Sequence, residues 1–466
     1  MTVRPSRRNL FQYTAALSLM PVVGYTDEKN AWARAAEIAR AVKAPVIPAR
    51  RFDITDFGAR SDGTTLNTQA FAAAIDACAK ADGGKIIVPA GRFLTGAIHL
   101  KSNMELHLSE GALILFSTDS NDYPIVFTRY EGLELMNYSP LIYAFGEKNI
   151  AITGSGTLDG QGSNADWWSW SGGAQFGWET GMPNQRAARL SLAQMAEDNV
   201  PVEQRVFGDG HFLRPNLIQT YNCENVLIEG VKLCNSPCWN IHPVQCRNVI
   251  VRSVDVFGHG PNNDGCDPES VDHMLIENCT FDTGDDCIAI KSGRNADGRR
   301  LATPAQNIVI RGCRMKDGHG GVVIGSEISG GVRWVFAENC RMDSPDLWYA
   351  LRFKNNAMRG GVLENLYFRD ISVGQVGKAV MTCDFNYEEG AKGAFKPVLR
   401  HVVVERLTAD HALRVLDSQG LPGAPVSDII LRDCRFDGVT EASIVTHTDD
   451  LHLEKVWVNG KNVDRL

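Results

Sequence analysis

A short phrase that recurs along the second two-thirds of the chain limits the folds open to this sequence more than any other feature. Each copy has a polar first residue followed by a run of β-prone residues. The copies that begin at residues 225, 248 and 273 lie 23 and 25 residues apart, and later gaps are longer where loops are inserted. The copies are Asn149-IAITG, Asn225-VLIEG, Asn248-VIVRS, His273-MLIEN, Asn307-IVIRG, Asn365-LYFRD, His401-VVVER and Asp428-IILRD.

A strand repeated at this interval, with turn residues between the copies, is typical of a parallel β-helix. One coil cannot bury its inner face alone, so neighbouring coils must stack with strands about 4.8 Å apart. We therefore predict an all-β chain folded as a right-handed parallel β-helix, a solenoid. The sixth position after each phrase start forms one inward column: Val231, Val254, Cys279, Cys313, Ile371, Leu407 and Cys434.

The segments outside the repeat suggest how the solenoid is finished. Residues 68–80 carry apolar residues at helical spacing and end before a glycine pair, which predicts a short N-terminal helix that caps the open end of the stack. We assign residues 27–50 to a linker with a short helix and residues 51–466 to a single β-helix domain. The repeat is lost at about residues 163–215, which we interpret as an insertion.

Arg7 and Arg8 precede a mildly apolar stretch, residues 13–24, at the start of the chain. This pattern resembles a bacterial twin-arginine export signal, and a disordered basic terminus is the alternative. We favour export, with residues 1–26 as the signal and the periplasm or the extracellular space as the destination. No stretch has the apolar length needed to span a bilayer, so we expect no membrane partner.

Composition excludes little else. The net charge of -8 argues against a nucleic-acid partner, but a polyanionic sugar senses the local field of its cleft and not the total charge. Twelve cysteines in 466 residues are too few for a disulfide scaffold. Those in the inward column read as small buried hydrophobic residues. Disulfides stay open among Cys223, Cys234, Cys238, Cys246, Cys266 and Cys287.

Three aspartates beside glycines are the main candidate for chemistry. Asp264 and the pair Asp285–Asp286 flank a strand-like run, residues 274–281, so they belong to two successive segments of similar build. If the segments stack, the carboxylates meet, and like charges held close separate their pKa values into one acid and one base. This is the equipment for cleaving a glycosidic bond. A calcium site or a solvated turn fits the same residues.

Two later stretches add candidates. His319 stands between two glycines, where backbone can approach a ligand closely. Arg352 and Lys354 leave the same face of a strand, while Phe353 leaves the other. Taken singly, each stretch reads as an ordinary polar residue or a solvated strand face.

Four stretches occur in a fixed order along the chain: Asn263-Asp264, Gly284-Asp285-Asp286, Gly318-His319-Gly320 and Arg352-Phe353-Lys354. Together they resemble the signatures of the polygalacturonases, glycoside hydrolase family 28. The resemblance runs from about residue 52 to about residue 431. This chain has Asn262-Asn263-Asp264 where the family usually has N-T-D, and R-F-K where it has R-I-K; both departures spare the charged positions. The resemblance implies inverting hydrolysis of pectin or an oligogalacturonide at α-1,4-galacturonosidic linkages, with neither a cofactor nor a metal.

The resemblance also implies roles for the candidates. Asp285 would be the general acid, kept protonated by its anionic neighbours, and Asp264 and Asp286 would activate the attacking water. His319 would tune the acid or help hold the sugar. Arg352 and Lys354 would grip a substrate carboxylate. We add three further substrate-binding candidates, namely Asn263, Arg214 and Trp178.

Residues 129–132 and 138–140 resemble bacterial members that trim chain ends, so we expect exo action by a monomer. Two alternatives stay open. A β-helical pectate lyase would use calcium held by the aspartates, and a non-catalytic polysaccharide-binding β-helix would need no clustered carboxylates.

Overall fold

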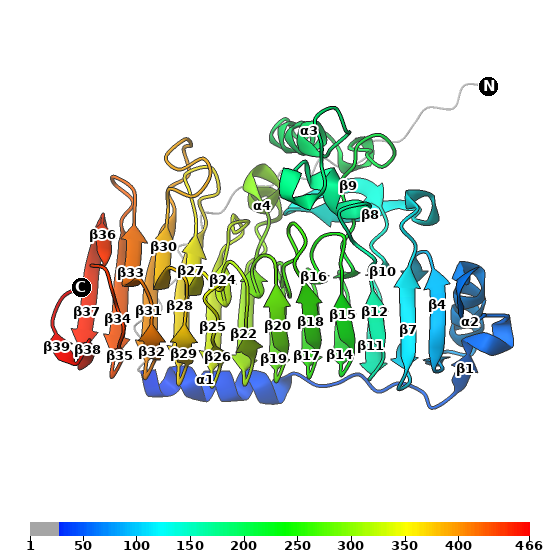
Figure 1. Ribbon diagram of the computed structural model, residues 1–466, viewed down its shortest axis with the longest axis horizontal. Coiled ribbons are helices and arrows are strands. Elements are labelled where there is room, and N and C mark those ends of the chain that lie inside the picture. The colour runs from blue at the N-terminus through cyan, green and yellow to red at the C-terminus, as the bar shows by residue number, and fades with distance from the viewer. Residues whose placement is uncertain (1–27) are drawn as a thin grey trace, which may run out of the picture.

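Most coils of the chain contribute one short strand to each of three parallel sheets, which run side by side along the length of the molecule (Figure 1). The computed structural model describes residues 28–466. The predicted export signal lies outside the described residues. The predicted parallel β-helix is confirmed.

The repeated phrases form the first sheet, and their first residues explain why asparagine recurs there. Asn149, Asn225 and Asn248 all have a positive φ, a conformation that asparagine tolerates better than most residues. Their side-chain amides also stack, because Asn225 Nδ2 donates to Asn149 Oδ1 at 2.9 Å and Asn248 Nδ2 donates to Asn225 Oδ1 at 2.5 Å. The first sheet consists of β1 (Arg51–Asp53), β3 (Gly84–Val88), β6 (Met104–Leu108), β11 (Lys148–Gly154), β14 (Glu224–Glu229), β17 (Arg247–Arg252), β19 (Asp272–Glu277), β22 (Ala305–Arg311), β25 (Val332–Glu338), β28 (Val362–Arg369), β31 (Val398–Glu405), β34 (Val426–Arg432) and β37 (Thr448–Glu454).

The second sheet follows the first within each coil after a tight corner. The inward column lies at this corner, and all seven of its residues are buried, as predicted. The second sheet consists of β2 (Asp62–Leu66), β4 (Gly91–Thr95), β7 (Ala112–Phe116), β12 (Thr157–Asp159), β15 (Lys232–Cys234), β18 (Asp255–Gly258), β20 (Thr280–Thr283), β23 (Arg314–Met315), β26 (Arg341–Met342), β29 (Ser372–Gln375), β32 (Thr408–His411), β35 (Arg435–Phe436), β38 (Val456–Val458) and the antiparallel β39 (Lys461–Val463).

The third sheet is divided into a part of four strands and a part of six. Single bridges from Cys266 to Ile241 and to Ile288 join the two parts, so the coil between them carries no regular third strand. The four are β5 (Ile98–His99), β10 (Ile142–Phe145), β13 (Ile218–Tyr221) and β16 (Ile241–Val244); the six are β21 (Ile288–Ile290), β24 (Val322–Ile324), β27 (Tyr349–Lys354), β30 (Ala379–Asp384), β33 (Arg414–Gln419) and β36 (Ile444–Thr446).

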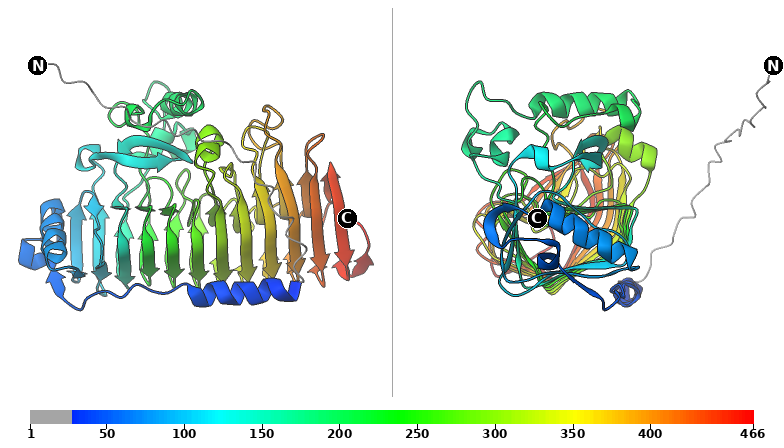
Figure 2. Two further views of the ribbon diagram at one scale, coloured as in Figure 1. Left: turned by 180° about the vertical axis from the view of Figure 1, so that it is seen from behind. Right: turned by 90° about the vertical axis from the view of Figure 1, so that its right-hand side faces the viewer.

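Two helices cover the apolar surfaces that the stack leaves open. The predicted capping helix is α2 (Thr68–Lys80), whose Phe71, Ile75 and Cys78 are buried against the first coils (Figure 2). The other helix, α1 (Glu28–Ala41), lies lengthwise beneath the first sheet, and its apolar side packs on outward residues of that sheet's strands (Figure 1). Within residues 28–466 no helix is both long and apolar enough to cross a membrane.

A roof stands above the four-strand part of the third sheet (Figure 1). It is built from the hairpin β8 (Ile125–Tyr130) and β9 (Leu133–Tyr138), the helix α3 (Arg186–Glu197) and the short α4 (Asn295–Leu301). The chain leaves the β-helix after β12 and returns at β13. The short 3-10 helices are η1 (Ile54–Phe57), η2 (Ser120–Asp122), η3 (Trp167–Ser171), η4 (Ala174–Phe176) and η5 (Val202–Gln204).

Candidate active site

The three aspartates converge at the turns that lead from the second sheet to the third. Asp264 and Asp286 stand two residues before Cys266 and Ile288, which are bridged, so stacking alone brings the two side chains together. One oxygen from each of Asp264, Asp285 and Asp286 lies within 4.8 Å of the others. Asp264 and Asp286 are buried, whereas Asp285 is partly open to solvent. The predicted meeting of the carboxylates is therefore present in the fold.

The two cations reach Asp286 across an intervening coil. Lys354 Nζ lies 2.6 Å from Asp286 Oδ2, and Arg352 Nη1 lies 3.3 Å from Asp286 Oδ1. Phe353 between them points into the core, as the alternation predicts. Gly320 occupies the coil between, and a Cβ there would meet Val323 at 2.4 Å and Arg352 at 3.4 Å. A side chain at this position would crowd the path of the cations, which explains the glycine.

His319 is fixed between the acid candidate and an aromatic ring. Its Nδ1 lies 2.8 Å from Asp285 Oδ1, and its ring stacks on Trp348 at a centroid distance of 3.9 Å. The stacking holds the imidazole plane, so the nitrogen that faces Asp285 is positioned by packing. Burial by itself would lower the pKa of His319, but the hydrogen bond and charge of Asp285 raise it.

The ionisation of Asp285 differs from the expectation. Burial would raise the pKa of this carboxyl, but the hydrogen bond and charge of His319, with the charges of Lys354 and Arg352, lower it to about 2. The prediction that its anionic neighbours keep Asp285 protonated is therefore wrong for the free protein. The cations that the sequence motifs bring in outweigh the neighbouring carboxylates.

Asp264 shows the opposite shift. Burial, followed by the charges of Asp267 and Asp285, raises the pKa of Asp264 well above its usual range. Asp267 is fully buried beside it, and burial raises the pKa of Asp267 to about 7. Lys291 forms ion pairs with the surrounding carboxylates. Its Nζ lies 3.6 Å from Asp264, 3.4 Å from Asp267 and 3.2 Å from Glu327. In the free protein, Asp264 thus keeps its proton more firmly than Asp285 does.

The three carboxylates are also a set that a divalent cation accepts, and His259, Asp282 and Asp317 form a second such set among residues 28–466. In the first set, however, the Lys354 ammonium already lies 2.6 Å from Asp286 and the Lys291 ammonium 3.6 Å from Asp264. Two fixed positive charges beside the carboxylates work against a calcium ion there. The arrangement suits acid–base chemistry on an anionic substrate better than metal binding.

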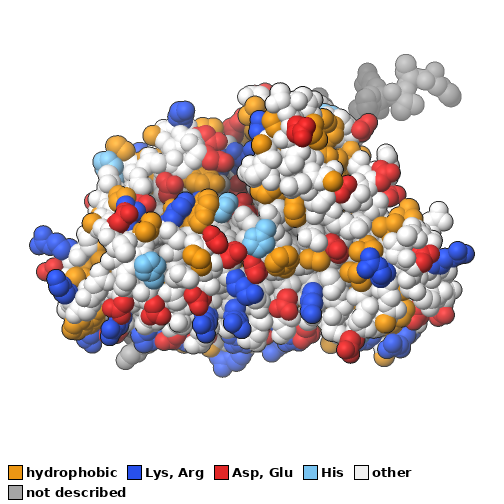
Figure 3. Space-filling view, viewed as in Figure 1, with side chains coloured by type: hydrophobic (Ala, Val, Ile, Leu, Met, Phe, Trp, Pro, Cys, Tyr) orange, Lys and Arg blue, Asp and Glu red, His pale blue; other side chains and the backbone are white. Residues whose placement is uncertain are grey.

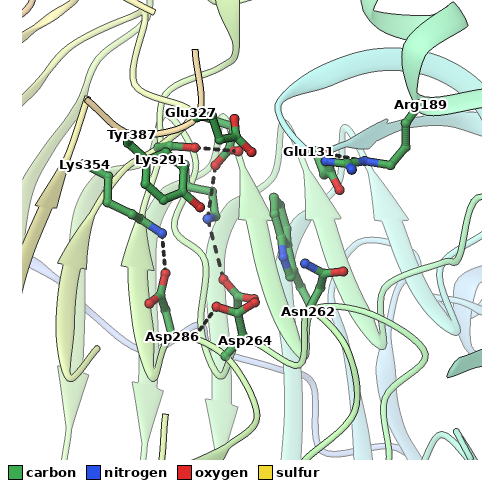
Figure 4. Close-up of a pocket in the computed structure, with 13 residues that line it drawn as sticks. Glu131, Arg189, Asn262, Asp264, Asp286, Lys291, Glu327, Lys354 and Tyr387 are labelled. Carbon is green, nitrogen blue, oxygen red and sulfur yellow. Dashed lines mark hydrogen bonds and ion pairs between the residues drawn. The ribbon is translucent and has the colours of Figure 1, made fainter. Parts of the chain in front are cut away.

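A pocket opens above the carboxylates, beneath the roof (Figure 3 and Figure 4). It lies in the hollow between the lobe that carries α3 and the loops above β27 and β30. Residues that the sequence motifs did not predict as site residues also line it: Trp239, Lys291, Ser326, Glu327, Tyr387, Glu388, Glu131 and Arg189. A signal for Lys291 was present, since a lysine that closes an apolar strand run directly after the aspartate pair is unusual. The others arrive from loops far away in sequence.

Three of the substrate-binding predictions need correction. Asn263 is fully buried, and its amide donates to the backbone oxygens of Ser236 and Cys238, so it supports the turn and does not face the pocket. Its neighbour Asn262 lines the pocket instead. A one-residue shift in the turn exchanges inside and outside, which the motif alone does not decide.

Arg214 and Trp178 also stand back from the pocket. Arg214 is buried, and its guanidinium donates to Asn262 Oδ1 at 2.7 Å, so it positions a pocket residue. Trp178 donates to the Met182 backbone oxygen and lies under Arg186, outside the pocket lining. Both residues belong to the long segment between β12 and β13 or to its return, whose path the repeat does not predict.

Comparison with known proteins agrees with this geometry. Residues 208–453 match the family model of the glycosyl hydrolases family 28. The chain is 46% identical to a hyperthermoactive exopolygalacturonase of Thermotoga maritima, whose crystal structure superposes with a TM-score of 0.90 over 94% of this chain and 98% of that one.

Two further relatives extend the comparison. An exo-poly-alpha-D-galacturonosidase of Dickeya chrysanthemi is 31% identical over 72% of this chain and 57% of that protein. A probable polygalacturonase of Vitis vinifera is 28% identical over 85% of this chain and 76% of that protein. The region that matches the family model contains all three aspartates, His319, Arg352 and Lys354. The chain therefore belongs to the glycosyl hydrolases family 28.

Proposed function

We propose that this protein is an exo-acting polygalacturonase that hydrolyses α-1,4-galacturonosidic linkages of pectin, polygalacturonate or oligogalacturonides. The observation that carries the proposal is the convergence of Asp264, Asp285 and Asp286 beside two cations, the partly exposed Arg352 and the buried Lys354. The carboxylates supply acid and base, and the cations select a sugar that bears a carboxylate.

Each group has a stated task in this proposal. Asp285, which is the most open of the three carboxylates, donates a proton to the glycosidic oxygen. Asp286, together with Asp264 once the Asp264 proton has passed to Asp285, orients and deprotonates the attacking water. Arg352 and Lys354 hold the substrate carboxylate, and His319 acts on Asp285 through its 2.8 Å contact.

Substrate binding favours the protonated form of Asp285, and the proton comes from Asp264, which holds it in the free protein. A galacturonate carboxylate placed at Arg352 and Lys354 brings a negative charge close to Asp285 and takes up the cationic field that lowers its pKa. Both effects raise the pKa of Asp285 in the complex. Asp285 is therefore protonated when an anionic substrate is bound, whereas a neutral sugar leaves Asp285 ionised.

The roof supports exo action. The hairpin β8–β9 and α3 place Glu131 and Arg189 in the pocket wall, so the groove is closed on that side (Figure 4). The names of the Thermotoga and Dickeya relatives describe exo-acting enzymes. A closed side admits a chain end and excludes the middle of a polymer.

Chromatography of the earliest products from polygalacturonate tests the function. We expect galacturonate alone, released while the polymer keeps its length, without ultraviolet absorbance and with full activity in chelator. A mixture of oligomers contradicts exo action. An unsaturated product that disappears with chelator identifies a lyase, and no new reducing ends on any pectic substrate indicates a non-catalytic binding protein.

Proton NMR of the first product tests the stereochemistry. The family resemblance implies inversion, whereas the separation of the carboxylates, within 4.8 Å, is nearer to the roughly 5–5.5 Å of retaining enzymes. We propose inversion with the β-anomer of galacturonate appearing first. First appearance of the α-anomer requires a covalent intermediate and assigns one aspartate as nucleophile.

The remaining parts of the proposal concern the whole chain. We propose that residues 51–466 form one catalytic domain that acts as a monomer and that residues 1–26 direct export to the periplasm or the extracellular space. A twin-arginine pair at Arg7 and Arg8 supports export. Fractionation of cells that express the full chain, with and without Arg7→Lys and Arg8→Lys, tests this.

A further inference from the structure

Two spaces meet at the side of the pocket that faces the roof. The first is the pocket above the carboxylates, and the second is an outer cavity of about 570 Å³ between α3, α4 and the loops that follow β27 and β30. Glu131, Arg189 and Glu388 line both. These three side chains therefore form a partition between the catalytic pocket and the outer cavity.

Glu131 is held in this partition by two arginines. Its Oε2 lies 2.6 Å from Arg189 Nη2 on α3 (Figure 4). The same oxygen lies 3.1 Å from Arg294 Nη1 at the start of α4. The carboxylate thus joins three separate elements of the roof. If the Glu131 side chain were absent, each arginine would lose the same partner.

The backbone under Glu131 is fixed as well. Glu131 and Gly132 form the tip of the hairpin, both with positive φ, and the Gly132 oxygen accepts from the Arg294 backbone at 3.0 Å. Arg129, at the end of β8, forms a fully buried ion pair with Glu269 at 2.7 Å, which ties the hairpin to the coil that follows Asp264. Since both ends of the tip are anchored, the partition is rigid.

The outer cavity has the size and the chemistry of a binding site without an assigned occupant. Its volume falls in the range of roughly 300–1,000 Å³ found for sites that hold small organic ligands. Arg186, Arg189 and Arg294 contribute cations to its lining, Glu197, Glu388 and Glu389 contribute carboxylates, and Leu190, Leu192 and Ala193 of α3 contribute apolar surface. A sugar ring with a carboxylate fits such a lining.

We propose that Glu131, clamped by Arg189 and Arg294, limits the released product to a single galacturonate, and that the outer cavity accepts a second galacturonate once this carboxylate is removed. The inference rests on the proposed exo-polygalacturonase function. Glu131 acts in two ways, because its side chain fills the passage and its charge repels the carboxylate of a second sugar. It is a specificity-determining residue.

The ion pairs make the effect of each variant different. Removal of Glu131 opens the passage and leaves Arg189 without this carboxylate, so Arg189 can bind the incoming sugar acid. Arg294 keeps its contacts of 3.6 Å with Glu388 and Glu389. Removal of Arg189 leaves Glu131 held by Arg294, and the passage stays closed. Glu131→Gly is the variant of choice, since glycine suits the positive φ of 44° at this turn position.

The test compares the early products of Glu131→Gly, Arg189→Ala and the wild-type protein on pentagalacturonate by anion-exchange chromatography. We expect the wild type and Arg189→Ala to release galacturonate. We expect Glu131→Gly to release digalacturonate as well, with the dimer-to-monomer ratio raised about tenfold or more. Glu229→Ala is the matched control, because Glu229 forms a similar ion pair with Arg252 at 2.6 Å on the first sheet, and its products should equal those of the wild type.

The outcomes separate the inference from the function on which it rests. If Glu131→Gly is folded, by its thermal unfolding, and still releases galacturonate alone, the inference is wrong. If Arg189→Ala also releases dimer, the assignment to Glu131 is wrong and any damage to the roof suffices. If the wild type releases no galacturonate, the proposed function fails first. Should Glu131→Gly not fold, Glu131→Ser gives the same comparison.

Discussion

Asp264 and Asp285 have the same side chain and neighbouring positions, yet their surroundings shift their pKa values in opposite directions. Burial and carboxylate neighbours raise the pKa of Asp264, while His319 and two further cations lower that of Asp285. The free protein therefore keeps its proton on Asp264. The proposed mechanism requires it on Asp285 in the complex, and this difference can be measured.

Leaving-group chemistry identifies the acid. We expect Asp285→Asn to reduce kcat on oligogalacturonides by on the order of 10³ or more, because general acid catalysis contributes about 10²–10⁴. On an aryl galacturonide, whose leaving group needs no proton, we expect a loss of less than about tenfold. Asp264→Asn, which removes part of the base, should be equally slow on both substrates. If the aryl galacturonide restores the kcat of Asp264→Asn and not that of Asp285→Asn, the general acid is Asp264.

The cation pair separates binding from chemistry. We expect Lys354→Ala mainly to raise KM, because the ammonium binds a carboxylate in the ground state as well as in the transition state. Its 2.6 Å contact with Asp286 adds a smaller fall in kcat. Steady-state kinetics on an oligogalacturonide series measures both constants. Unchanged KM with a large loss of kcat would contradict the substrate-binding role and leave only the contact with Asp286.

Asp267 predicts how stability depends on pH. Burial raises the pKa of this carboxyl from its ordinary value of 3.8 to about 7, so between about pH 4 and pH 7 the unfolded chain loses this proton before the folded protein does. The unfolded state then binds fewer protons, and stability falls as the pH rises through this window. Asp267→Asn removes this slope and leaves Lys291 paired with Asp264 and Glu327.

We expect Asp267→Asn to gain stability relative to the wild type on going from pH 4 to pH 7, on the order of 2–4 kcal/mol. Thermal or urea unfolding at the two pH values measures this gain. A constant difference between variant and wild type across the window would show that Asp267 is ionised in the folded protein throughout.

At the scale of elements, the helices α1 and α2 both cover apolar surfaces of the β-helix, at different places. The stack exposes apolar side chains at its N-terminal end and along the outer face of the first sheet, and α2 and α1 cover these surfaces respectively. Arg34 of α1 donates to Asn307 at 2.9 Å, and the Lys43 backbone exchanges hydrogen bonds with Asn248 at 2.9 and 3.0 Å. The phrase-start residues thus serve as docking points for the N-terminal segment.

Docking of α1 is testable at Ile38, which is buried against the first sheet. We expect Ile38→Ala to lower the free energy of unfolding by about 2–4 kcal/mol, because it removes buried apolar atoms and leaves a cavity. Differential scanning calorimetry should show a fall of a few degrees in Tm. Glu37→Ala, one residue away on the exposed side of the same helix, should leave the free energy of unfolding within about 0.5 kcal/mol of the wild type. Equal effects of both changes would mean that α1 is not held by apolar packing.

At the scale of the whole molecule, stacking of coils replaces covalent cross-links. All twelve cysteines are free in the described residues, and eleven of them are buried. The disulfides that the sequence left open are thus not formed. The core columns hold the chain together because each coil buries its inner face against the next.

A thiol assay measures this directly. We expect twelve reactive thiols in denaturant and few in the folded protein, because buried thiols with raised pKa values, such as Cys383 and Cys287, react slowly. Tm should be the same with and without a reducing agent. A Tm that falls in reductant, or fewer than twelve thiols in denaturant, would reveal a disulfide.

The sequence by itself determined the β-helix, its capping helix α2, the inward column and the family signatures. These follow from local periodicity, since a strand repeated at 23 to 25 residues must stack and a stack fixes which residues face inward. Stacking also brings Asp264, Asp286, Gly320 and Lys354 to one place, because each holds a set position relative to a strand. The sequence motifs therefore predicted the charged centre of the site.

Only the tertiary structure decided what surrounds that centre. The insertion and the hairpin follow no repeat, so nothing local predicts that Glu131 and Arg189 reach the pocket while Trp178 does not. The direction of the pKa shift at Asp285 depends on how near the cations lie. These cations are His319, Lys354 and Arg352, which come from the two coils that follow the coil of Asp285. Periodicity fixes the order of the coils, but distances between charges exist only once the chain has folded.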